Sequence, residues 1–231
     1  MSLPQQLKSY EFERRLIPST DMDRLIHLKV ICDHLGTPLL APDEKQVPLD
    51  LNDFMGSPDP LEIEIGCGKG NFMQEYCEKF PNKPFLGIDQ EGAIAFFAAQ
   101  RMAKRKQLQN YRVIFGDAYY FFRDFLPENS VAAFHMYFPD PWPKKRHRKR
   151  RLLNKPFLEE IHRIATPDAK FYWGTDFQNY HEESMEIFNE TPWLQIEIEN
   201  AGPTEGIETN FEKKYRIEGR PIYRTQLKIV K

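Results

Sequence analysis

The stretch that decides the fold is Leu61-Glu62-Ile63-Glu64-Ile65-Gly66-Cys67-Gly68-Lys69-Gly70. An apolar strand runs here into three alternating glycines, which permit a tight turn and let a ligand approach the backbone before a helix begins. The spacing differs from the Gly-x-Gly-x-x-Gly turn of dinucleotide-binding folds, and no Lys-Ser or Lys-Thr pair follows, as it does in phosphate-binding loops. The glycines therefore indicate a strand-to-helix turn that either binds a ligand or serves the fold alone.

From Leu61 onward, short apolar runs alternate with longer amphipathic segments. This alternation predicts strands at Leu61–Ile65, Phe85–Asp89, Tyr111–Phe115, Val131–Phe138 and Lys170–Thr175. Helices are expected between and after them, at Asn71–Phe80, Gly92–Lys106, Ala118–Leu126, Lys155–Ile164 and Tyr180–Phe188. The last two strands, Trp193–Glu199 and Ile222–Val230, are expected to pair antiparallel at one edge. The pattern therefore predicts an α/β, doubly wound Rossmann-like fold with a mostly parallel sheet and an antiparallel edge strand.

Residues 1–57 lack the regular alternation of the later residues, because prolines interrupt them repeatedly. One helix is expected in this segment, at Asp21–Leu35, with an aspartate as N-cap and Gly36 as its end. We therefore predict an N-terminal arm over residues 1–57 and a single domain over residues 58–231.

Acidic side chains stand at the ends of successive predicted strands, namely Glu64, Asp89, Asp117 and Asp140. One such acid is more often a helix N-cap than a ligand contact. Ligands of doubly wound folds bind beyond the carboxyl ends of the strands, so four acids are expected to converge on one crevice. Because S-adenosylmethionine carries a sulfonium and an ammonium but no phosphate, this acidic crevice favours S-adenosylmethionine over NAD as the cofactor.

A stiff and then strongly basic loop follows the fourth predicted strand. Phe138-Pro139-Asp140-Pro141-Trp142-Pro143 holds Asp140 between prolines, and seven of the next eight residues, 144–151, are Lys or Arg. A basic run is usually a solvated face or tail. Here it lies in mid-chain beside the predicted crevice, which favours a phosphate-binding strip that attracts RNA without reading its sequence.

Composition limits the remaining possibilities. The formal net charge of −2 means that attraction to RNA must come from local clusters of charge. Three cysteines, Cys32, Cys67 and Cys77, give no paired framework, and no His or Cys cluster has the spacing of a metal site. Met1–Tyr10 lacks the apolar run of a signal peptide, and no stretch reaches the ~18 apolar residues that span a bilayer. We therefore expect a cytoplasmic protein with no metal and no membrane contact.

The chain resembles the bacterial tRNA (guanine-N7-)-methyltransferases over roughly residue 60 to the C-terminus. The resemblance rests on the 138–147 loop with the following Arg150-Arg151-Leu152, on the glycine turn, and on three shorter stretches: Gly174-Thr175-Asp176, Thr209-Asn210-Phe211-Glu212 and Gly219-Arg220-Pro221-Ile222-Tyr223. Residues 10–15 match the family only loosely. The chain departs from the family pattern at Asp89, where Glu is frequent, and at Asn210, where Lys is frequent.

The resemblance implies a role for each matching position. S-adenosylmethionine would be bound by Glu64, Gly66, Gly68, Gly70, Asp89, Asp117 and Asp140, and Asp140 would be the catalytic residue. The guanosine and its neighbours would contact Lys144, Asp176, Thr209, Asn210, Phe211 and Glu212. The tRNA would contact Arg146, Arg148, Lys149, Arg150 and Arg151. The acceptor implied is position 46 of the tRNA variable loop, and the protein is expected to be a monomer or a homodimer.

Two other functions are compatible with parts of the pattern. A methyltransferase acting on a protein or a small amine would explain the glycines and acids but not the basic loop. A non-catalytic RNA-binding module would explain the basic loop, but it would not need an acid at each strand end. An NAD-linked dehydrogenase fits least, because its glycine spacing is missing.

Overall fold

The computed structural model describes residues 25–27, by their backbone, and residues 48–231. The chain divides into two compact units, the first ending at Pro127 and the second running from Glu128 to Lys231. Each unit is built around its own hydrogen-bonded strands. The predicted boundary between the arm and the domain lies at residue 57 and does not coincide with the division after Pro127. The boundary at residue 57 stays a prediction.

The first unit contains a parallel set of strands in the order β1-β4-β3-β2. Their bounds are β1 Leu25–His27, β2 Leu61–Ile65, β3 Phe85–Asp89 and β4 Tyr111–Phe115. All five residues of β2 are buried, and so are the first four of β3 and of β4. Strands buried on both faces form near-continuous apolar runs, and the three predicted here are confirmed at both ends.

The short strand β1 corrects one prediction. Leu25–His27 was expected inside a helix at Asp21–Leu35, yet it pairs in parallel with β4, Leu25 opposite Val113 and His27 opposite Phe115. The free edge of β4 needs hydrogen-bond partners for its backbone, and that long-range pairing overrides a weak local helix propensity. The remainder of that predicted helix, and the basic-aromatic stretch at residues 10–15, lie outside the described residues.

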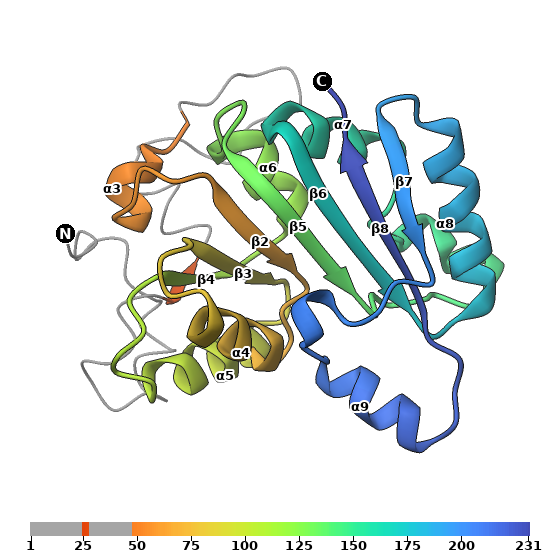
Figure 1. Cartoon of the computed structure of the whole chain (residues 1–231), viewed down its shortest axis with the longest axis horizontal. Coiled ribbons are helices and arrows are strands. Elements are labelled where there is room, and N and C mark those ends of the chain that lie inside the picture. The colour runs from red at the N-terminus through yellow and green to blue at the C-terminus, as the bar shows by residue number, and fades with distance from the viewer. Residues whose placement is uncertain (1–24, 28–47) are drawn as a thin grey trace. The chain divides into compact units, whose positions relative to one another are not determined.

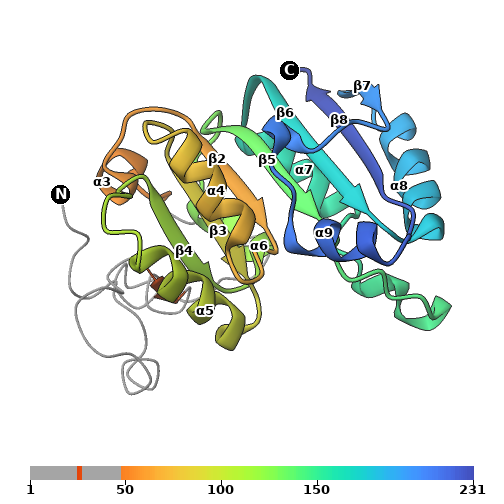
Figure 2. The same cartoon turned by 60° about the horizontal axis from the view of Figure 1, so that its bottom comes forward.

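Among the described residues of this unit, four helices accompany the strands: α3 Leu51–Met55, α4 Asn71–Lys79, α5 Gly92–Ala103 and α6 Ala118–Phe125. Helices α4 and α5 lie side by side on one face of the strands (Figure 2). The core beneath α4 is aromatic, because Tyr76 packs on Phe85 with 5.0 Å between ring centroids and Phe72 lies 6.4 Å from the same ring. Burial of such rings accounts for much of the stability of the unit.

The second unit contains strands in the order β5-β6-β8-β7. Their bounds are β5 Val131–Tyr137, β6 Ala165–Thr175, β7 Leu194–Glu199 and β8 Tyr223–Ile229. β5 and β6 are parallel, whereas β8 runs antiparallel to both β6 and β7. The predicted antiparallel pairing of the last two strands is therefore confirmed for β7 and β8, and β8 lies between β6 and β7. β6 begins five residues earlier than expected because a register shift after Val131 extends its pairing with β5.

The helices of this unit are α7 Lys155–Ile164, α8 Gln178–Glu190 and α9 Asn210–Ile217, with two 3₁₀ helices, η2 Lys145–Arg150 and η3 Thr204–Gly206. Phe171 and Trp173 of β6 pack edge-to-face on Phe188 of α8. Helix α9 was not predicted; it lies beyond the carboxyl ends of β5 and β6 (Figure 1). Across the described ranges, no helix is both long enough and apolar enough to cross a bilayer.

Candidate active site

The glycine turn connects β2 to α4 and has three left-handed residues. Gly66, Gly68 and Gly70 have φ values of 74°, 53° and 70°. A Cβ on Gly70 would lie 3.1 Å from the Cβ of Ala98, whereas a Cβ on Gly66 or Gly68 would meet no atom within 4 Å. Gly70 therefore allows close packing of α4 against α5. Gly66 and Gly68 border open space, which leaves room for a ligand against the backbone.

Glu64 lies in β2 just before this turn and is buried, with 4% of its surface exposed. The backbone N–H of Met73 donates to its carboxylate, but Oε2 has no hydrogen-bond partner within the described part of the chain. Burial, and secondarily the nearby charge of Asp89, raises the pKa of Glu64 well above its ordinary value of 4.5. A buried acid with a vacant acceptor is a common feature of binding sites, since it gains a partner when a ligand arrives.

Asp89 holds a backbone group of the glycine turn, whereas Asp117 holds the start of α6. The Asp89 carboxylate accepts hydrogen bonds from the N–H of Gly68 at 3.0 Å and of Glu91 at 2.9 Å. Asp117 is exposed and caps α6, accepting from the N–H of Tyr119 at 2.8 Å. Burial, together with the charges of Glu64 and Asp89, raises the pKa of the Cys67 thiol, so this cysteine is no nucleophile. An acidic turn with open glycines fits a cationic, hydroxyl-bearing ligand better than a phosphate.

In the second unit, the loop after β5 is held in an uncommon backbone conformation. Phe138 and Trp142 have φ values of 51° and 41°, in the left-handed region that non-glycine residues rarely adopt. The N–H of Phe138 donates to the carbonyl of Gly174 at 2.6 Å, which fixes the start of the loop to β6. Asp140 lies exposed between these two positions. Such strain persists only where the surroundings enforce it, and it is frequent at functional sites.

Arg151 is the residue that anchors this loop. Its Nε and Nη2 both donate to the carbonyl of Pro141, at 2.9 and 2.6 Å, and its Nη1 donates to Glu183 of α8 at 2.6 Å. The guanidinium also lies 4.2 Å from the ring centre of Tyr180, and only 4% of Arg151 is exposed. This placement argues against the predicted contact of Arg151 with RNA, because its donors are used inside the protein.

The other basic residues of the loop face solvent to different degrees. Lys144, Arg146, Lys149 and Arg150 are exposed, and η2 carries most of them. Arg150 lies 4.8 Å from the ring centre of Trp142, and Arg148 is half-buried with Nη1 3.4 Å from Glu183. The exposed cations can meet an anionic partner, while Arg148 is partly engaged by α8.

Asp176, which follows β6, is paired with a cation that the sequence analysis did not assign. Its Oδ2 accepts from Nη2 of Arg220, and the guanidinium of Arg220 lies 4.0 Å from the ring centre of Tyr215. Arg220 belongs to one of the stretches that resemble the methyltransferase family, so the sequence could have indicated it as a site residue. The pair orients the Asp176 carboxylate at the carboxyl end of β6.

The stretch Thr209–Glu212 divides into two inward and two outward side chains. Thr209 is buried and caps α9, its Oγ1 accepting from the N–H of Glu212 at 3.1 Å. Glu212 is buried in a two-bond ion pair with Arg224 of β8, one bond being 3.1 Å from Nε to Oε1. Asn210 and Phe211 are exposed. Thr209 and Glu212 therefore fix α9, and Asn210 and Phe211 are the pair free to meet a substrate.

Tyr137 and Trp173 are buried in the core of the second unit. Tyr137 donates to Oγ1 of Thr204 at 2.7 Å and lies 3.0 Å from Nδ1 of the buried His135. The acids Glu64, Asp89 and Asp117 belong to the first unit and Asp140 belongs to the second, so the expected convergence of all four stays a prediction.

Comparison with known proteins places the chain among methyltransferases. The family model Methyltransf_4, described as "Putative methyltransferase", matches residues 58–225. A tRNA (guanine-N(7)-)-methyltransferase of Geobacter metallireducens is 38% identical over 191 residues, covering 80% of this chain and 89% of that protein. One from Lactobacillus gasseri is 33% identical, covering 84% of this chain and 92% of that protein. One from Thermotoga maritima is 31% identical over 176 residues, which span 56% of its length.

Solved structures confirm the fold class. An antibiotic-related methyltransferase superposes with a TM-score of 0.59 at 19% identity, covering 80% of this chain and 97% of that chain. The 16S rRNA methyltransferase KamB gives a TM-score of 0.59 at 14% identity, covering 83% and 99%. At these identities the likeness concerns the Rossmann-like methyltransferase fold alone, whereas the relatives above match along most of the sequence. By descent, the chain belongs to the tRNA (guanine-N(7)-)-methyltransferase family.

Proposed function

We propose that this protein transfers a methyl group from S-adenosylmethionine to N7 of a guanosine in tRNA, at position 46 of the variable loop. The observation that carries the proposal is the buried Glu64 carboxylate, with its vacant oxygen, beside the open turn at Gly66 and Gly68. The sequence relatives in Geobacter and Lactobacillus support the choice of tRNA and guanine as acceptor. As tRNA is modified in the cytoplasm, we place the protein there.

The first unit supplies the residues that suit the donor. When bound, S-adenosylmethionine supplies an electrophilic methyl group on a sulfonium. Glu64 offers a carboxylate whose ionised form a cationic ligand would stabilise, because a neighbouring positive charge favours the charged state of an acid. Asp89 ends β3, at a position where acids of Rossmann-like folds accept hydrogen bonds from ribose hydroxyls, and Asp117 caps α6.

The second unit supplies the residues that suit the acceptor. Guanine N7 has a lone pair and no proton, so its attack on a methyl group needs no general base. Positive charge grows on the purine as the bond forms, and a carboxylate fixed nearby stabilises that charge in the transition state. Asp140 and Asp176 are the acids available. In this proposal they orient the guanine, accept hydrogen bonds from its N1–H and amino group, and stabilise the developing charge.

The test is incubation of the purified protein with methyl-labelled S-adenosylmethionine and an unmodified tRNA transcript, followed by nucleoside analysis. Label in 7-methylguanosine, lost in Asp140→Ala while donor binding persists, supports the proposal. Label in another nucleoside or in protein reassigns the acceptor. Binding of tRNA without transfer of label supports the non-catalytic alternative.

A further inference from the structure

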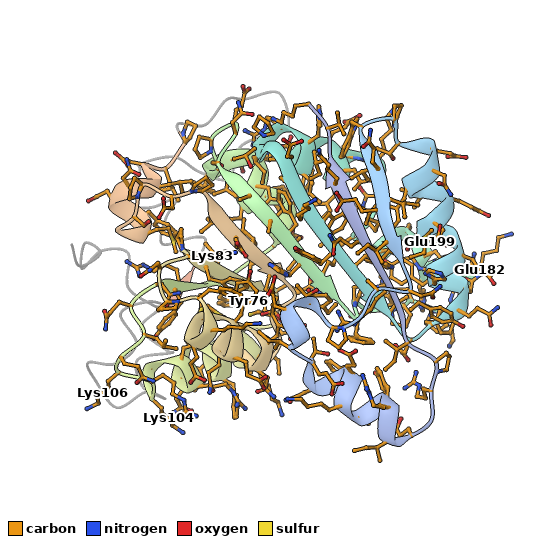
Figure 3. The ribbon with its side chains drawn as sticks, in the orientation of Figure 1. Tyr76, Lys83, Lys104, Lys106, Glu182 and Glu199 are labelled. Carbon is orange, nitrogen blue, oxygen red and sulfur yellow. The ribbon has the colours of Figure 1, made fainter. Side chains whose placement is uncertain are left out.

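The first unit carries a basic surface along α5 that the proposed function does not use. We call it the α5 basic surface and define it by Lys69, Arg101, Lys104, Arg105 and Lys106. All are exposed except Arg101, which is partly exposed. Three of them border a hollow of about 190 Å³, which is lined by Gln74, Phe97, Gln100, Arg101, Lys104 and Arg105. Figure 3 shows Lys104 and Lys106 extending from the end of α5 away from the strands.

An exposed aromatic ring organises part of this surface. Phe97 is 41% exposed, and both Lys69 and Arg101 place their cationic groups over it, at 5.3 and 5.7 Å from its centre. Contacts of this kind hold flexible cations at fixed positions. Nε of Arg101 is buried with no hydrogen-bond partner within the described ranges. The guanidinium of Arg101 is thus held in place and can still donate a hydrogen bond.

Negative charge on this surface is limited. Glu78 of α4 pairs with Nε of Arg105 at 3.1 Å, and both side chains are largely exposed. Exposed pairs of this type contribute little and do not bind the cation strongly. Within the described residues, four further cations of this surface stand beside that ion pair, in a protein whose total charge is −2. A local concentration of positive charge on a weakly acidic protein needs an anionic partner to explain it.

We propose that the α5 basic surface binds the phosphate backbone of the substrate tRNA, as a second contact in addition to the one proposed for the basic loop of the second unit. The proposal rests on the proposed function, from which tRNA is the polyanion that this protein must bind. Arg101 lies in the last turn of α5 and three more of the cations, at positions 104–106, follow its end at Ala103, so these four can contact neighbouring phosphates. Arginines bind phosphate through two parallel donors, and lysines add point charges. Such contacts add affinity and orientation but carry no base information.

The test compares Lys104→Ala/Lys106→Ala with a control, Lys170→Ala/Lys228→Ala, which removes two lysines already paired with Glu197 and Asp168. Binding of fluorescent tRNA is measured over a range of salt concentrations. The surface variant is expected to bind roughly tenfold more weakly at ~0.1 M salt, with a salt slope reduced by about 1.5. Its affinity for S-adenosylmethionine and its methyl-transfer rate at saturating tRNA should equal those of the wild type.

If the surface variant binds tRNA tenfold more weakly than the control, the result supports the inference. Absence of methyl transfer in the wild type would overturn the proposed function but would not affect this result. Wild-type methylation with equal tRNA affinity in the surface and control variants overturns the inference alone. Unchanged tRNA affinity with weaker binding of polyglutamate would assign the surface to an acidic protein and also overturn it.

Discussion

Glu64 is a buried acid that lowers the stability of the folded protein when it is ionised. Its carboxyl is buried beside Asp89, and one of its oxygens has no partner in the described structure. A carboxyl in such a position is stable only while protonated, and a cation is the natural partner of its ionised form. The sequence placed an acid here correctly, but burial and the vacant oxygen are properties of packing that no local pattern encodes.

We predict that Glu64→Gln removes a pH-dependent loss of stability from the ligand-free protein. The pKa of Glu64 is raised in the folded chain, so the folded state binds more protons than the unfolded state above the ordinary value of 4.5, and stability falls as pH rises. In urea unfolding, the advantage of Glu64→Gln over wild type should grow as the pH rises above the ordinary value of 4.5. A stability difference that stays constant across this range would contradict the account.

The buried pair of Glu212 and Arg224 makes a second prediction at this scale. Both residues are at most 3% exposed. Removing one partner leaves the other charge buried and uncompensated, so Glu212→Ala should lower the free energy of unfolding by about 3–5 kcal/mol. Glu212→Leu/Arg224→Met, which removes both charges and retains volume, should recover most of that loss in chemical denaturation. If the double variant is as unstable as Glu212→Ala, the cause is lost packing of α9 and not the stranded charge.

The loop from Phe138 to Arg151 combines two kinds of basic residue within one element. Arg151 points inward and ties Pro141 to Glu183, while its neighbours along η2 face solvent. The sequence shows them as one uninterrupted basic run, so it could not separate the anchor from the residues that meet RNA. The difference arises from a carbonyl and a carboxylate that are ten and 32 residues away along the chain.

For the exposed Lys149 and Arg150 and the half-buried Arg148, we predict that replacement of all three with Ala weakens tRNA binding and flattens its salt dependence. Each lost phosphate contact should reduce the slope of log affinity against log salt by about 0.7–0.9. Affinity for S-adenosylmethionine should be nearly unchanged, because no residue of the first unit is altered. Titration of both ligands checks this, and equal losses of both affinities would refute the separate roles of loop and glycine turn.

For the inward residue, Arg151→Lys should act in the opposite way. Lysine keeps the positive charge but cannot donate to Pro141 and Glu183 together, so the loop that carries Asp140 loses its anchor. We expect a lower rate constant at saturating tRNA with little change in tRNA affinity, and a loss of about 1–3 kcal/mol in stability. Single-turnover kinetics distinguish the cases: an unchanged rate with weaker tRNA binding would make Arg151 an RNA contact after all.

Among the elements, those with a continuous buried pattern could be predicted and those that depend on distant partners could not. β2, β3 and β4 have the predicted bounds because their apolar runs are buried almost throughout. Helix α9 was missed because Glu212 is its one buried residue, which leaves no apolar stripe to recognise. β1 was missed because its pairing with β4 bridges more than eighty residues of chain.

At the scale of the whole molecule, the glycine turn and three acids belong to one compact unit, and the 138–151 loop, Asp176 and α9 belong to the other. The family resemblance covered both, so fold class and function followed from the sequence. The roles of individual residues were harder to predict. Arg151, Thr209 and Glu212 were expected to contact the substrate, and in the structure their side chains bond other residues of the protein. A sequence motif contains both the residues that hold a site in place and the residues that contact its ligands, and the motif alone does not distinguish them.

We propose that guanine N7 in the tRNA variable loop is the atom that accepts the methyl group. Two transcripts test it, one with guanosine at position 46 and one with 7-deazaguanosine there, which replaces N7 by a C–H and leaves the pairing edge intact. With methyl-labelled S-adenosylmethionine, the account predicts that the first transcript takes up label and the second takes up none while binding equally well. Equal labelling of both transcripts would contradict it.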